Sequence, residues 1–246
     1  MFGIFIFIYY FYIYRNLYII KDMSLTSFIK EKLKVNKEYV EVHTEKPENI
    51  KELRKIIDDR IEEQGPGTVK EPIDLNDIDV SEIDNLDYLF YGGTTYNIKA
   101  IDISDWDVSN VTSFRSMFEG CSHLQYVGDL SRWDVSEGTN FSSMFMNCKF
   151  LKNIGDVSKW KMSKANDVHS MFCGCKRLEN IGDAGQWDVS NVKDFTFIFR
   201  DCEKLRPIDL NHWKIHNDVT GKNVRMIISG TSGWKMPDWF FDVRKR

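Results

Sequence analysis

The segment WDVSNVTSFRSMFEGCSHLQYVGDL, residues 106–130, is one copy of a pattern that repeats along this chain of 246 residues. Its tryptophan, second phenylalanine, cysteine and first leucine each return at intervals of 27 residues, and a further tryptophan, Trp213, follows after 26. Several positions locked to one period across four copies indicate a tandem repeat. These positions are Trp106, Trp133, Trp160 and Trp187; Phe118, Phe145, Phe172 and Phe199; Cys121, Cys148, Cys175 and Cys202; and Leu124, Leu151, Leu178 and Leu205.

Each copy has the pattern of a short helix followed by a short strand. Ser109 is a suitable helix N-cap, and Gly120 a suitable end. An apolar stripe lies between them at helical spacing, and it consists of Val111, Phe114, Met117 and Phe118. One copy cannot bury its own apolar face, so successive copies must stack. The sequence therefore predicts an α/β solenoid with one short helix and one short strand per 27-residue coil, and about six coils over residues 75–241.

Residues 23–74 are expected to form a helical N-terminal cap for this solenoid. Ser24–Leu33 is a short amphipathic candidate, and Pro47 suits the first turn of a second helix. The apolar residues of that second helix follow at helical spacing, and they are Ile50, Leu53, Ile57 and Ile61. The chain closes with a basic tail, residues 242–246.

Residues 1–22 form an apolar segment that begins MFGIFIFIYYFYIY. A membrane span needs about 20 mostly apolar residues, so this segment is borderline in length. It has neither the basic leader nor the small-residue cleavage site of a signal peptide. Two interpretations stay open: a membrane anchor within residues 1–20, or translation that begins at Met23 and leaves a cytoplasmic protein.

The composition is that of a soluble globular chain, with 42% apolar and 28% charged residues. The net charge of −4 gives no broad electrostatic attraction to nucleic acid or to an anionic membrane surface. We therefore expect no nucleic-acid partner.

The copies WDVSNVTSFRSMFEGC and WDVSNVKDFTFIFRDC resemble the repeat of BspA-type leucine-rich-repeat proteins. That family includes many bacterial surface proteins and mycoplasma lipoproteins, and the resemblance covers roughly residues 70–241. It implies a leucine-rich-repeat-like solenoid at a cell surface that takes part in adhesion or other protein–protein interaction. The chain departs from the family in showing no clean secretion signal.

Three kinds of residue would form stacked ladders, and each has competing interpretations. The cysteines are more simply small buried residues than zinc ligands or disulfides, because a row does not provide tetrahedral coordination. The tryptophans favour a buried corner over an exposed sugar-binding strip. A third ladder favours carboxylates that accept backbone N–H groups at turns over a cation site, and it consists of Asp129, Asp156, Asp183 and Asp209.

Positions between the framework residues vary from copy to copy and are expected to tile one lateral face of the solenoid. Such variety suits recognition of an irregular partner such as a protein, although the same residues could simply be solvated. The candidate binding residues are His123, Gln125, Tyr126, Phe150, Lys152, Asn153, Arg177, Glu179, Asn180, Lys204 and Arg206.

The sequence indicates no catalytic residues, no metal ligands and no cofactor, because it contains no phosphate loop, nucleophile elbow or HExxH motif. The function that we expect is a non-enzymatic scaffold for a protein or another macromolecule. The alternatives are a membrane-anchored structural protein and an enzyme whose site is assembled from distant residues.

Overall fold

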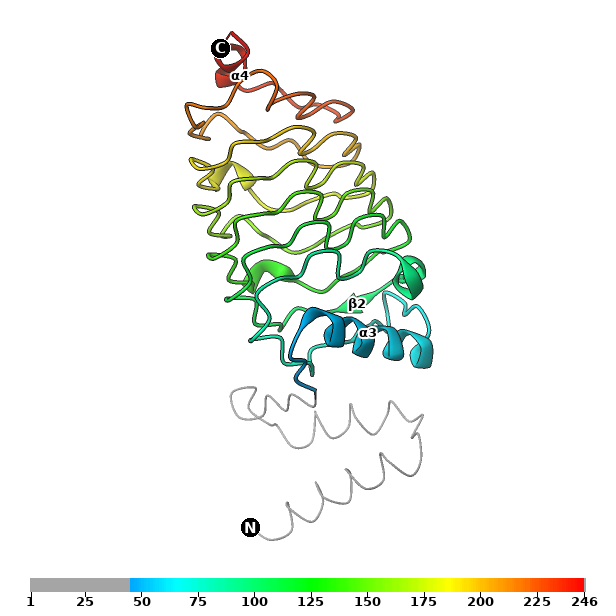
Figure 1. The fold of residues 1–246 in the computed structure, drawn as a ribbon. Helices are drawn as coiled ribbons and strands as arrows, with labels where there is room; N and C mark the ends of the chain where they lie inside the picture. Colours follow the sequence, from blue (N-terminus) through cyan, green and yellow to red (C-terminus); the bar gives the residue numbers. More distant parts are fainter. Residues whose placement is uncertain (1–44, 246) are drawn as a thin grey trace, which may run out of the picture. The chain divides into compact units, whose positions relative to one another are not determined.

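The structure is a computed structural model that describes residues 45–245. Figure 1 shows these residues as a stack of coils with a helix at the N-terminal end. The expected apolar segment 1–22 and the candidate helix Ser24–Leu33 lie outside the described residues. Helices and strands within them are α3 (Ile50–Gln64), β1 (Ile73–Asp74), β2 (Ile101–Asp102) and α4 (Asp238–Val243), with 3-10 turns η1 (Gly93–Asn97), η2 (Leu130–Arg132) and η3 (Ala184–Gln186).

Helix α3 covers the first coil through one apolar face. Asn49 caps the helix by accepting the N–H groups of Lys51 and Glu52, and Gly65 ends it. Pro47 thus precedes the helix, and the prediction that it lies in the first turn is wrong. Leu53, Ile57 and Ile61 are buried in the common core, and the helix contacts β1 and η1.

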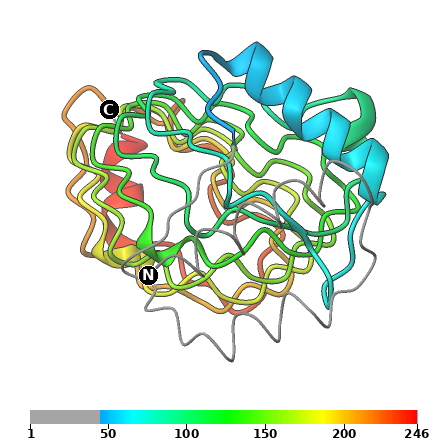
Figure 2. The ribbon, with the colours of Figure 1, turned by 90° about the horizontal axis from the view of Figure 1, so that it is seen from below.

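Backbone hydrogen bonds join successive coils along two rows. In the first row, β1 pairs in parallel with β2, and parallel bridges continue it at Ala100–Tyr126 and Asn153–Asn180. The second row runs through the bridges Ser113–Asn140, Asn140–Asp167 and Asp167–Asp194. Figure 2, which views the stack along its length, shows how closely one coil overlays the next.

The prediction of one helix in each coil is wrong for the described residues. In its place is a run of turns in which the N–H groups of Phe114, Ser116 and Phe118 donate to the next coil. The intervening N–H group of Met117 bonds three residues back within its own coil. Ser116 has φ 53°, a left-handed conformation that a helix cannot contain, and Ser143 and Ser170 repeat it.

The spacing between coils explains why helices are excluded. Rings of Phe118 and Phe145 in successive coils are 5.2 Å apart, and those of Phe145 and Phe172 are 5.6 Å apart. Packed helices need about 8–10 Å between their axes. A ladder with strand-like spacing therefore has no room for one helix per coil. The expected strand is likewise reduced to isolated bridges beyond β2.

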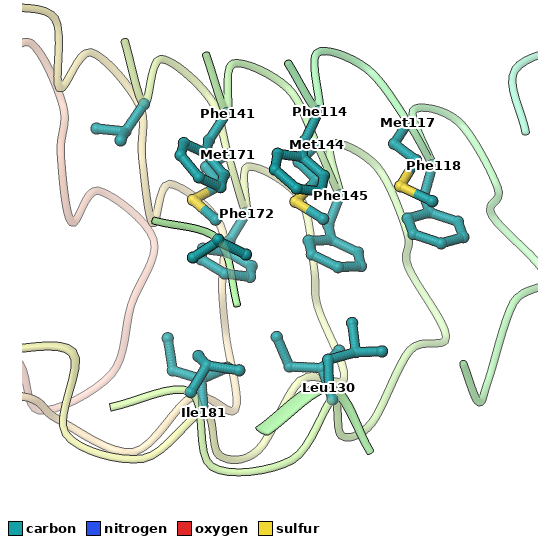
Figure 3. Close-up of a cluster of buried hydrophobic side chains, with 14 of the residues drawn as sticks. Phe114, Met117, Phe118, Leu130, Phe141, Met144, Phe145, Met171, Phe172 and Ile181 are labelled. Atoms are coloured by element: carbon teal, nitrogen blue, oxygen red, sulfur yellow. The ribbon is translucent and has the colours of Figure 1, made fainter. Parts of the chain in front are cut away.

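Stacked phenylalanines and methionines fill the core, as Figure 3 shows. Phe118, Phe145 and Phe172 lie in one line, with Leu130 and Ile181 on the opposite side of the interior. All five side chains are fully buried.

The indole groups also lie inside, so the interpretation of the tryptophan ladder as core is confirmed. Trp133 is 4% exposed, and its Nε1 donates to the carbonyl of Ile103 in the preceding coil at 3.1 Å. Trp160 makes the same bond to Leu130 at 3.0 Å. This pattern satisfies the one polar atom of each buried indole.

Candidate functional site

The expected lateral face is held in register by the first row of backbone bonds. The N–H groups of Gln125, Glu179 and Arg206 donate to the carbonyls of Lys99, Lys152 and Glu179 in the preceding coils. Because backbone groups at these positions bond along the stack, their side chains project sideways. Most are exposed, while Gln125 and Tyr126 are half-buried.

A groove of about 540 Å³ lies on this face. Five of the expected residues line it together: Phe150, Lys152, Arg177, Glu179 and Lys204. Three further lining residues, Lys149, Lys176 and Glu203, were missed by the sequence analysis. They belong to the turn after each ladder cysteine, and their charge and variability between copies are the signal that could have identified them.

The groove carries an excess of positive charge. Its cations are Lys149, Lys152, Lys176, Arg177 and Lys204, and its anions are Glu179 and Glu203. Lys176 Nζ lies 2.6 Å from Glu203 Oε1, and this hydrogen bond raises the pKa of the lysine. The pair is exposed, so it contributes little to stability.

Phe150 is the exposed aromatic residue of the groove. It is 38% exposed and lies between the guanidinium of Arg177, 4.4 Å from its ring centroid, and the ring of His123, 6.4 Å away. Aromatic and arginine side chains held in this way are enriched at the centres of protein interfaces.

Two of the expected binding residues have a structural role. Asn153 Oδ1 accepts the N–H of Gly155 at 2.9 Å, and Asn180 Oδ1 accepts the N–H of Gly182 at 3.1 Å. These carboxamide oxygens shape turns beside the face. Tyr126 lies outside the groove, and burial followed by the charges of Asp102 and Asp129 raises its pKa.

A second groove, of about 590 Å³, lies along the other row of backbone bonds and was not predicted from the sequence. Its lining is polar, with Tyr88, Arg115, Asn140, Asp167 and His169 among the residues. Asp167 accepts the N–H of His169 at 2.8 Å, and burial raises the pKa of its carboxyl group.

The ladder cysteines are buried thiols, which supports their interpretation as core residues. Cys148 Sγ donates to the carbonyl of Phe118 at 3.1 Å, and Cys175 Sγ to that of Phe145 at 3.0 Å. Burial raises the pKa of Cys121 to about 12. Within residues 45–245, no three His, Cys, Asp or Glu side chains are grouped so that they could hold a metal ion.

The aspartate ladder caps turns, as expected. Asp129, Asp156 and Asp209 accept the N–H groups of Ser131, Ser158 and Asn211 at 3.0 Å. Hydrogen bonds from Ser158 lower the pKa of Asp156. Ser109 was expected to be an N-cap. Its N–H group instead donates to Asp107, so the carboxylate of Asp107 caps the start of the turn.

One family model matches most of the stack, over residues 65–181 and again over 150–232, and it is described as "Mycoplasma protein of unknown function, DUF285". The chain belongs to this DUF285 family. Neither the curated proteins nor the solved structures gave a match to the chain. In the part of this DUF285 protein that the structure describes, no helix is long and apolar enough to cross a membrane.

Proposed function

We propose that this protein is a non-enzymatic binding scaffold in which a leucine-rich-repeat-like solenoid presents its lateral face to a partner protein. The observation that supports this most is the groove of about 540 Å³ lined by Phe150, Lys152, Arg177, Glu179 and Lys204. It brings together residues from several coils on a backbone that hydrogen bonds between the coils hold in register.

The charge of the groove favours a partner with an acidic surface. Five cations against two carboxylates attract such a surface over roughly 10 Å at moderate salt. Phe150, with Arg177 above its ring, offers an apolar and cationic contact at the centre. Exposed cation–π pairs contribute only about 0.5–1 kcal/mol, so affinity has to come from several such contacts together.

A quantitative pull-down tests this proposal. We expect a variant with Lys152, Arg177, Lys204 and Arg206 all replaced by Ala to lose a partner that the parent captures. A matched variant with Lys159, Lys193, Lys214 and Lys235 replaced by Ala removes the same charge from exposed positions outside the groove. Equal capture by the parent and the first variant would show that the lateral face does not bind the partner.

We further propose that the chain is of the BspA type and lies at the cell surface, where it takes part in adhesion. Support comes from the resemblance of its repeats and from membership of a mycoplasma family. Labelling of intact cells with a membrane-impermeant biotin reagent is the test, with a cytoplasmic protein as the control. A protein labelled only after lysis would favour a cytoplasmic location, and N-terminal mass mapping would then show whether it begins at Met23.

A further inference from the structure

The two ends of the stack differ in the backbone groups that they present. Within the run of turns, alternate N–H groups donate to carbonyls of the next coil, as Phe197 does to the carbonyl of Arg225, whereas the N–H groups just before the run donate to the preceding coil, as Lys193 does to Asn166. Over the run of turns, one edge of the second row therefore consists of acceptors and the other of donors. An ordinary edge strand alternates the two kinds of group.

At the N-terminal end, a cation from α3 contacts carbonyls of the first coil. Arg54 donates to the carbonyls of Tyr88 at 3.1 Å, Tyr91 at 2.5 Å and Gly92 at 3.1 Å. Of these carbonyls, that of Tyr91 corresponds to an acceptor of the row in later coils, such as Met146, so a positive group lies at one point of the acceptor edge.

At the C-terminal end, the corresponding donors are left open. Met226, Ile228 and Gly230 occupy the positions of Phe197, Phe199 and Asp201 in the coil before, and their N–H groups have no hydrogen-bond partner among residues 45–245. Met226 is 45% exposed and has φ 50°. Backbone N–H groups presented in a row with left-handed residues form an anion-binding concavity.

A groove of about 790 Å³ lies beside these donors. Its cations are Lys222, Arg225 and Arg244, and none of the three forms an ion pair within the described part of the chain. Its apolar lining includes Met226 and Phe240. Backbone donors and side-chain cations together favour a negatively charged occupant.

We propose that this C-terminal edge binds an extended acidic segment of another protein. Main-chain and carboxylate oxygens of the segment accept the N–H groups of Met226, Ile228 and Gly230, because this edge offers donors and an anion-binding concavity rather than the alternating groups of a sheet edge. Its carboxylates pair with Lys222, Arg225 and Arg244.

Fluorescence anisotropy on the full-length chain tests the proposal with a labelled octapeptide of alternating Glu and Val. A peptide of alternating Gln and Val is the uncharged control. We expect the acidic peptide to bind and K222E/R225E/R244E to weaken binding at least tenfold. The matched variant K149E/K152E/K204E reverses the same charge on the lateral face and should change binding less than twofold.

Amide hydrogen exchange measured by NMR on the parent protein gives a second readout that does not depend on a variant's folding. Exchange at Met226, Ile228 and Gly230 should slow when the acidic peptide is added. No binding, unchanged exchange at these amides, or equal binding by K222E/R225E/R244E would each overturn the proposal. Loss of peptide binding only in K149E/K152E/K204E would overturn it too, while leaving the lateral face of the proposed function intact.

Discussion

At the scale of single residues, the repeated side chains serve the interior of the stack. Each ladder cysteine donates its thiol to a phenylalanine carbonyl of the preceding coil, as Cys148 does to Phe118. A thiol in this position is a small apolar group with one weak donor. Cys148 lies on the ladder and is fully buried, whereas Cys173 lies off it and is half-buried.

Burial of the ladder thiols predicts a loss of stability in alkaline solution. The pKa of Cys148 is raised well above 9.0 in the folded chain, so the unfolded chain releases this proton first as pH rises. Stability from this group is complete below pH 9 and falls by roughly 1.4 kcal/mol per pH unit above it. In urea unfolding between pH 8.5 and 10.5, Cys148→Ala should lose correspondingly less stability than the parent. Identical pH dependence in the two proteins would contradict the burial of this thiol. Burial raises the pKa of the half-buried Cys173 as well, so Cys173→Ala should change the pH dependence in the same direction but less.

At the scale of elements, the sequence predicted the ladders but mistook the conformation between them. The 27-residue spacing identified which side chains stack, and the structure buries Trp133, Phe145 and Cys148 accordingly. A helix and the observed run of turns both place residues three and four positions apart on one side, so periodicity could not separate them. The two conformations differ in the hydrogen bonds between coils, such as that from the N–H of Phe114 to the carbonyl of Asn140. The sequence of a single copy does not reveal these bonds. The second groove was missed for the same reason.

Glycine substitution distinguishes the run of turns from a helix. Ser143 has φ 56°, a conformation that costs about 1 kcal/mol for a side-chain-bearing residue and nothing for glycine. Ser143→Gly should therefore keep or raise the free energy of unfolding, and Ser143→Val should lower it by about 1–2 kcal/mol. In a helix, glycine would instead cost about 0.5–1 kcal/mol. Urea unfolding measures both variants, with Ser163→Gly as a control outside the left-handed positions. A loss of 1 kcal/mol in Ser143→Gly would contradict the turn conformation.

At the scale of the whole molecule, stability is expected to pass from coil to coil. Each coil bonds only to its neighbours, so a stack of this kind behaves as a sum of local terms and nearest-neighbour interfaces. The terminal coils have only one neighbour each, so they are the least stable and need a capping element. Helix α3 covers one end with Leu53, Ile57 and Arg54, a feature that the helical spacing of Ile50, Leu53 and Ile57 made predictable. The role of Arg54 was not predictable, because its carbonyl partners lie 34–38 residues away in sequence.

Removal of the Arg54 guanidinium should loosen the first coil and leave the last one unchanged. Arg54→Met keeps the aliphatic part of the side chain and removes the charged donor from the carbonyls of Tyr88, Tyr91 and Gly92. Tyr88 still accepts from the Tyr91 N–H and Gly92 from the Thr95 hydroxyl, so the carbonyl of Tyr91 loses most. Hydrogen bonds from a charged group are worth about 1.5–3 kcal/mol, and that loss should appear as local opening of the coil it covers. Hydrogen exchange measured by mass spectrometry should be faster in peptides from residues 85–98 and unaltered in peptides from residues 223–231. Lys55→Met, on the exposed side of the same helix, is the control for a lost surface charge. Equal acceleration along the whole stack would mean that the coils unfold as one cooperative unit, contrary to nearest-neighbour coupling.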